Sequence, residues 1–112
     1  MEFLTKLEEL VLIAILKLRD DAYGISVYKY VVGLTGKDVS VSSVYFPLER
    51  LVRKGYLQTL KGEPTPQRGG MSKRYYRLTK SGIKVLKENR SFNETAWKGV
   101  KDMLRSAGEA SG

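Results

Sequence analysis

The chain has 112 residues, 42% of them hydrophobic and 29% charged, which is ordinary for a single folded domain. It contains no cysteine and no histidine, and this excludes disulfides, thiolate zinc sites and the most common catalytic base. We therefore expect no enzyme active site, no metal site and no cofactor. The longest apolar run, residues 10–16, is too short to cross a bilayer, so we expect a cytoplasmic protein.

The net charge of +8 comes from the middle of the chain. Residues 49–90 hold 12 basic and 3 acidic side chains, whereas residues 1–48 hold 5 and 6 and residues 91–112 hold 3 of each. Phosphate binding through counterion release requires a local positive field, so this concentration predicts a polyanionic partner. The alternative is a solvated surface of mixed charge.

The N-terminal helix is predicted over residues 4–18. Thr5 and Glu8 form a capping box, and apolar residues recur behind it at helical spacing. The apolar surface is wider than a single stripe. Such a helix suits either packing on both its own core and a neighbouring molecule, or full burial in one core.

Two further helices are predicted before residue 56. A turn at residues 19–22 precedes the first of them, which ends at the glycines of residues 33–36. Serines at residues 40–43 offer capping hydroxyls for the next helix, which ends at residues 54–55. Two short helices joined by a tight turn are typical of a helix-turn-helix unit.

A β-hairpin follows, with strands over residues 56–61 and 72–78. The connecting residues 62–71 contain prolines and glycines, which prevent them from continuing either strand. A hairpin with a basic tip directly after a helix-turn-helix is a wing. Tyr75 and Tyr76 point to opposite faces, so we expect one in the core, with stacking on single-stranded nucleic acid as the alternative.

The C-terminal region is predicted to be a dimerisation helix over residues 80–107, capped by Thr79, with Ile83 and Leu86 on its inner face. A bend is expected at residues 91–94, where a second capping box lies. An apolar seam suited to a partner helix follows: Ala96, Val100, Met103 and Ala107, flanked by Trp97 and Leu104. Residues 1–79 would form the DNA-binding domain, and residues 108–112 a disordered tail.

The predicted helix that ends at residues 54–55 is where a DNA sequence would be read. Val44, Leu48 and Leu51 fall at i, i+4 and i+7 and are expected to pack inward. Hydroxyls on the opposite face suit several bases, Phe46 suits a thymine methyl, and Arg50 suits guanine or phosphate. That face presents Ser42, Ser43, Phe46, Glu49, Arg50 and Arg53, with Tyr45 at its edge. The alternative is a solvated helix surface.

The wing carries a second group of basic residues. Arg68 lies beside two glycines that permit close approach to a duplex, and it is expected to enter a minor groove. Lys73 and Arg77 are expected to contact phosphates, together with Arg74. A plain solvated hairpin is the alternative.

Several blocks are specific enough to indicate a family. Residues 42–51 read SSVYFPLERL, residues 54–57 read KGYL, residues 68–70 read RGG and residues 73–79 read KRYYRLT, with YGI at residues 23–25. Over residues 5–88 these blocks resemble the PadR family of winged-helix transcriptional regulators, in its compact subgroup with one C-terminal helix. One departure is Phe46, which stands where the family commonly has proline, so that proline moves to position 47.

The resemblance implies a homodimeric repressor whose recognition helices enter successive major grooves of a palindrome, with repression relieved by an effector. It implies DNA reading by Ser42, Ser43, Tyr45 and Phe46, and wing contacts by Arg68, Lys73 and Arg74. The expected dimer interface combines both terminal helices through Leu4, Leu7, Val11, Ala96, Trp97, Val100, Met103 and Leu104.

Two questions stay open at this stage. Trp97 either stacks on a flat aromatic effector, as in some compact members of the family, or anchors the dimer as a hydrophobic residue. The whole domain either binds double-stranded DNA or serves as a winged-helix module for protein–protein interaction. The concentrated positive charge favours DNA.

Overall fold

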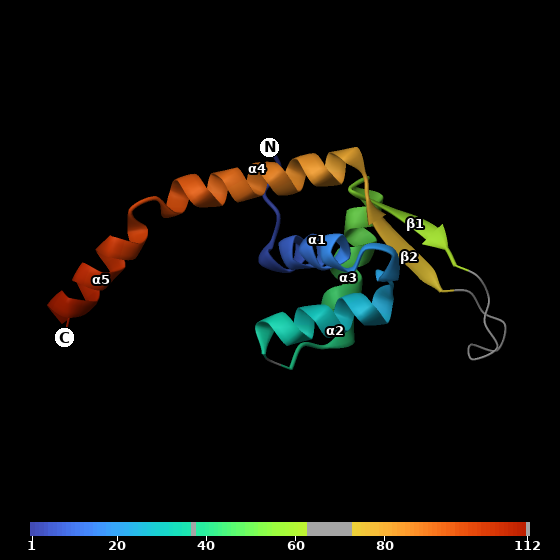
Figure 1. Cartoon of the computed structure of the whole chain (residues 1–112), viewed down its shortest axis with the longest axis horizontal. Coiled ribbons are helices and arrows are strands. Elements are labelled where there is room, and N and C mark those ends of the chain that lie inside the picture. Colours follow the sequence, from blue (N-terminus) through green and yellow to red (C-terminus); the bar gives the residue numbers. More distant parts are fainter. Residues whose placement is uncertain (37, 63–72, 112) are drawn as a thin grey trace.

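The computed structural model describes residues 1–36, 38–62 and 73–111. These residues form a helical protein with one antiparallel hairpin, which confirms the predicted winged helix-turn-helix class (Figure 1). The elements are α1 (Lys6–Leu18), a 3₁₀ turn (Arg19–Asp21), α2 (Gly24–Thr35), α3 (Val41–Arg53), β1 (Leu57–Lys61), β2 (Arg74–Leu78), α4 (Lys80–Trp97) and α5 (Val100–Ser111).

Short-range signals set the helix boundaries. The predicted capping box closes α1, because the amide of Glu8 donates to Thr5 Oγ1 at 3.1 Å and the amide of Thr5 donates to Glu8 Oε1 at 2.8 Å. Gly36 ends α2 in the left-handed region, with φ of 63°. Ser40 caps α3 by accepting from the amide of Ser43 at 3.2 Å.

Pro47 lies inside α3 without ending it. A proline there lacks the N–H that would bond to the carbonyl of residue 43, and it commonly bends or breaks a helix. Here α3 continues from Val41 to Arg53, with the proline buried against the body of the protein. Phe46 is therefore held on the outer side of α3, where 67% of its surface is exposed.

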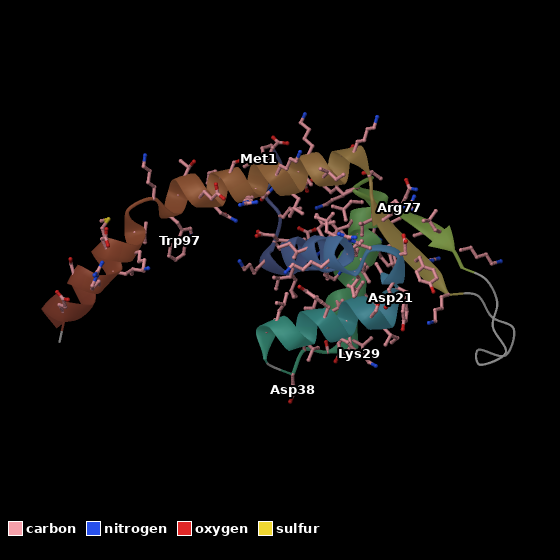
Figure 2. All side chains as sticks on the ribbon, viewed as in Figure 1. Met1, Asp21, Lys29, Asp38, Arg77 and Trp97 are labelled. Carbon is pink, nitrogen blue, oxygen red and sulfur yellow. The ribbon has the colours of Figure 1, made fainter. Side chains whose placement is uncertain are left out.

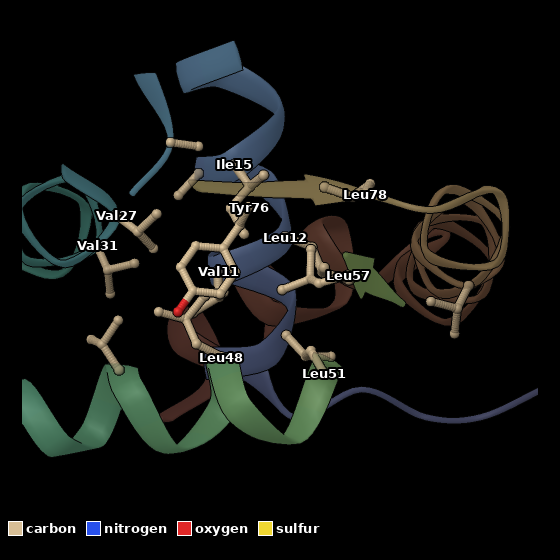
Figure 3. Packing of buried hydrophobic residues seen from close by; sticks show 14 residues of the cluster. Val11, Leu12, Ile15, Val27, Val31, Leu48, Leu51, Leu57, Tyr76 and Leu78 are labelled. Carbon is tan, nitrogen blue, oxygen red and sulfur yellow. The ribbon is translucent and has the colours of Figure 1, made fainter. Parts of the chain in front are cut away.

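One hydrophobic core joins α1, α2, α3, the hairpin and the start of α4 (Figure 3). Tyr76 is buried in it while Tyr75 is only partly buried, as the alternation of the strand predicted. The amide of Tyr76 donates to the carbonyl of Ala22 at 2.9 Å, which fixes the hairpin against the start of α2. Val11 is completely buried inside this core, so its predicted place at a dimer interface is wrong.

The C-terminal region differs most from its prediction. α4 buries Gly82, Val85 and Asn89, whereas Ile83, which was expected inside, is exposed. A Cβ at Gly82 would overlap the carbonyl of Tyr56, so a larger residue there would push α4 off the body.

The expected bend at residues 91–94 is absent, and α4 runs on to Trp97. The break comes at Lys98 and Gly99, where Gly99 adopts a φ of 79°. The helix predicted over residues 80–107 is thus two helices, and α5 reaches Ser111 where a disordered tail was expected. Figure 1 shows α5 projecting away from α1, α2 and α3. The radius of gyration, 17.4 Å, exceeds the roughly 13 Å of a compact chain of this length.

Candidate nucleic-acid interface

The outer side of α3 carries a continuous stripe of side chains at helical spacing. Ser42, Phe46, Glu49 and Arg53 are separated by four, three and four residues, so they share one face. All four lie opposite the buried residues of α3 and reach solvent. These four of the residues predicted for the reading face therefore form the exposed stripe of α3.

Ser43 and Tyr45, also predicted to read DNA, lie to the sides of this stripe. The Ser43 hydroxyl lies 2.7 Å from the Ser40 hydroxyl and so belongs to the cap of α3. The Tyr45 ring packs over Gly24, and a Cβ at that glycine would overlap the Tyr45 hydroxyl. Tyr45 therefore spaces α3 from the start of α2, and it needs a glycine there.

Arg50 does not share the outer stripe. Its Nε donates to Glu8 Oε2 at 3.0 Å, and the Nζ of Lys54 donates to the same oxygen at 3.3 Å. Glu8 is 1% exposed, whereas the Arg50 side chain keeps 38% of its surface in contact with solvent. Arg50, which was predicted to contact DNA, forms a long-range ion pair that fixes the last turns of α3 on α1.

Residues 1–5, the N-terminal strap, extend this ion pair into a network. The Glu2 carboxylate pairs with Lys54 Nζ at 2.6 Å and accepts from the Tyr56 hydroxyl at 2.6 Å. Asn89 of α4 donates to the carbonyl of Glu2 at 2.9 Å and accepts from the amide of Leu4 at 3.0 Å. The strap thus ties α4 to the end of α3.

The network shifts the titration of its members. Burial acts to raise the pKa of Glu8, but hydrogen bonds from Thr5, Arg50 and Lys54 outweigh it, so the pKa lies below the ordinary value. Hydrogen bonds from Lys54 and then Tyr56 lower the pKa of Glu2. The Glu2 carboxylate in turn raises the pKa of Lys54 and that of Tyr56. Both carboxylates are therefore charged in the folded protein at neutral pH.

The base of the wing lies against the start of α2 and the outer side of α3. The Nζ of Lys73 lies 4.0 Å from the centre of the Tyr23 ring, and this ring meets Tyr75 edge-on with centres 5.7 Å apart. Arg74 donates to Glu49 Oε1 at 3.2 Å. No role in the site was predicted for Tyr23, yet its ring contacts both Lys73 and Tyr75 at the base of the wing.

A groove of about 340 Å³ separates these elements. It is lined by Tyr23, Gly24, Ile25, Tyr45, Glu49, Lys73, Arg74 and Tyr76. Glu49 thus connects the α3 stripe to the wing cations along this groove. We name these residues together the candidate DNA-facing surface: Ser42, Phe46, Glu49, Arg53, Lys73 and Arg74.

Arg77, another of the predicted wing residues, is not part of this surface. Arg77 is three residues along β2 from Arg74, so the two side chains point to opposite faces of the hairpin. Arg77 instead lines a separate groove with Arg19 and Asp20. Arg68 lies outside the described residues.

The predicted interface residues near the C-terminus are largely exposed. Trp97 lies at the end of α4 (Figure 2) and exposes 61% of its surface. Met103 and Leu104 on α5 are exposed as well. Ala96 is also exposed and Val100 is partly buried. Leu4 and Leu7 are partly buried against the core. Phe3 of the strap meets Phe92 of α4 edge-on, with ring centres 5.0 Å apart.

Neither a metal-binding cluster nor a membrane-spanning helix is found among the residues that the structure describes. No group of three or more acidic, histidine or cysteine side chains there is placed to hold a metal ion. No helix in that part of the chain is long and apolar enough to span a membrane.

Comparisons with known proteins agree with this geometry. The family model described as the transcriptional regulator PadR-like family matches residues 12–88, more than half of the chain. A search of curated proteins gave no match.

Among solved structures, a transcriptional regulator from Clostridium thermocellum is similar at a TM-score of 0.68 and 24% identity, over 86% of this chain and 87% of that chain. A PadR family regulator from Clostridium difficile gives a TM-score of 0.64 and 20% identity, over 91% and 97%. A PadR family regulator from Eggerthella lenta gives a TM-score of 0.65 and 27% identity, over 85% of this chain and 80% of that chain. The chain therefore belongs to the PadR-like family of transcriptional regulators, which act by binding DNA.

Proposed function

We propose that this protein is a homodimeric repressor that reads a palindromic operator in double-stranded DNA. The observation that carries the proposal is the DNA-facing surface, where the exposed stripe of α3 reaches through Glu49 into a groove that Lys73 and Arg74 of the wing also line. An α-helix fits the width of the major groove of DNA, and the N-terminal residues of a recognition helix reach base edges there. Ser42 and Phe46 would contact bases, while Arg53, Lys73, Arg74 and the wing residue Arg68 would contact phosphates or enter the minor groove.

The residues beside the surface would act indirectly. Ser43 and Tyr45 hold the start of α3 through the Ser40 hydroxyl and through Gly24. Arg50 is engaged by Glu8, so we leave it out of the DNA-contacting set. Arg77 faces the other side of the hairpin, where it would meet at most a distant phosphate.

DNA binding is tested by fluorescence anisotropy with the DNA upstream of the gene at rising salt concentrations. We expect an affinity that falls steeply with salt, because bound cations release counterions from the duplex. Arg53→Ala should weaken binding and lower the slope of log K against log salt by roughly 1. Arg105→Ala removes the same charge from α5 and is the matched control.

The alternative, a winged-helix module that binds protein, predicts a different result. Duplex DNA would then bind weakly and without sequence preference, and reversing the charge of Arg53 would leave regulation in the cell unchanged. Either observation would contradict the proposal.

Dimerisation would use residues 80–107, with residues 1–79 as the DNA-binding domain. Trp97, Met103 and Leu104 are exposed apolar side chains at the end of α4 and on α5, and burying them against a second copy would stabilise a dimer. Leu4 and Leu7, which are partly buried, would line the edge of that interface. Analytical ultracentrifugation should show a dimer that Met103→Asp combined with Leu104→Asp converts to monomers, while Lys101→Asp leaves it intact.

Trp97 would also be the contact for a flat aromatic effector. With 61% of its surface exposed, its indole presents a face for stacking. Planar aromatic compounds should quench its fluorescence and weaken operator binding in parallel. If Trp97→Ala only dissociates the dimer and no such compound affects the unmodified protein, Trp97 is a dimer anchor.

A further inference from the structure

Glu49 is an acidic side chain on the DNA-facing surface. It lies on the stripe between Phe46 and Arg53 and exposes 47% of its side chain beside the groove at the wing base. Phosphates repel a carboxylate at this position, so the residue lowers the affinity for DNA of any sequence.

Arg74 offsets this charge. Its guanidinium donates to Glu49 Oε1 at 3.2 Å while 60% of the Arg74 side chain remains exposed. The pair brings a carboxylate close to the duplex with little net negative charge. A carboxylate has about four acceptor positions, so the bond from Arg74 leaves acceptors for another donor.

We infer that Glu49 determines sequence specificity by accepting a hydrogen bond from an exocyclic amino group in the major groove, either cytosine N4 or adenine N6. The inference rests on the proposed function, which places α3 in that groove. The amino groups of cytosine and adenine are the hydrogen-bond donors that base pairs present there, whereas guanine and thymine offer acceptors. An ionised carboxylate accepts only, so it suits the first pair of bases and disfavours the second.

A purely structural role for the pair makes a different prediction. If the bond between Glu49 and Arg74 only holds the wing base on α3, then removing the carboxylate changes the affinity for all sequences by the same factor. If Glu49 reads a base, the change falls on one position in each half-site.

The test uses the full-length protein and the duplex that it selects from a random library. At each cytosine of that duplex, 2-pyrimidinone removes only the N4 amino group, and at each adenine, purine removes only the N6 amino group. Dissociation constants are measured by anisotropy for the unmodified protein, Glu49→Ala and Glu49→Gln. Glu94→Ala, which removes an equal charge from α4, is the control.

We expect that an analogue at one position per half-site lowers the affinity of the unmodified protein and of Glu94→Ala roughly tenfold. The same analogue should leave the affinity of Glu49→Ala unchanged. Cytosine and adenine analogues identify which amino group is bound. Glu49→Gln keeps a carbonyl acceptor and similar size, so it should retain part of the preference and should fold even if Glu49→Ala does not.

Two outcomes overturn the inference, and they are distinguishable. The first outcome is that the unmodified protein binds its duplex but removing any one amino group leaves its affinity unchanged, or that Glu49→Ala and Glu49→Gln lose as much affinity on that removal as the unmodified protein does. Glu49 then does not read a base, although the proposed function stands. If the unmodified protein selects no duplex, the proposed function fails as well.

Discussion

The body of the protein and its C-terminal arm are built in opposite ways. In the body, α1, α2, α3, the hairpin and the start of α4 bury a continuous set of apolar side chains. In the arm, from Phe92 to the end of α5, large apolar side chains such as Trp97 and Met103 stay exposed. The body therefore draws its stability from its own core, whereas the apolar face of the arm would be buried only in the dimer that we propose.

The largest difference between the two regions should appear on truncating one leucine in each. Leu12→Ala creates a cavity in the core and should lower the free energy of unfolding by about 3 kcal/mol. Leu104→Ala on α5 should change it by less than about 0.5 kcal/mol in dilute protein, where the arm is solvated. Urea denaturation followed by circular dichroism measures both. Equal losses would mean that the arm is packed as tightly as the body.

The next effect tests the ion pair that holds α3 on α1. Glu8→Gln keeps the shape of the side chain but leaves Arg50 and Lys54 without their shared carboxylate. We expect a loss of about 2 kcal/mol, less than for a fully enclosed pair because Arg50 reaches solvent. In the same denaturation series, Glu94→Gln on the exposed surface of α4 should leave the free energy of unfolding almost unchanged. A loss as large as that of Glu8→Gln would contradict a particular stabilising role for the Glu8 network.

Acid should weaken the same network. The folded protein lowers the pKa of Glu8 and of Glu2 below the ordinary 4.5, so their stabilisation is complete above that pH and is lost as the pH falls through the lowered values. The folded protein raises the pKa of Lys54, so the stabilisation that Lys54 provides is complete below the ordinary 10.5 and is lost only as the pH rises through the raised value. As the pH is lowered from 7 to 2, the midpoint temperature of thermal unfolding should fall more steeply for the unmodified protein than for Glu8→Gln. Parallel curves would contradict this assignment.

The smallest effect is expected on the arm. Asp102 and Arg105 form an exposed i, i+3 pair on α5, and such pairs contribute little because water and salt screen them. Asp102→Asn should change the free energy of unfolding by about 0.3 kcal/mol at most. A larger change that grows with protein concentration would instead place Asp102 at the dimer interface.

Local signals account for the parts of the fold that were predicted correctly. The capping box of Thr5 and Glu8, the termination at Gly36 and the opposite faces of Tyr75 and Tyr76 each depend on residues within a few positions of one another. The hydrophobic spacing of Val44, Leu48 and Leu51 likewise oriented α3, and with it the exposed stripe of the candidate site.

Long-range contacts account for the errors. Nothing near Arg50 in the sequence reveals that Glu8, 42 positions away, binds its guanidinium. Val11 shares the apolar character of interface residues, and only the packing of the whole core shows that no part of it is accessible. The break at Gly99 does have a local signal, a glycine free to adopt positive φ, whereas the capping box near residue 91 does not interrupt the helix.

The N-terminal strap has a consequence for the order in which the chain folds. Its bonds to Asn89 span 85 and 87 positions, nearly the whole length of the protein. Closing so long a loop costs entropy that only a preformed core repays, so the strap should dock after the helices beneath it have assembled. During synthesis Asn89 leaves the ribosome long after Glu2. The first residues made are therefore among the last to reach their native partners.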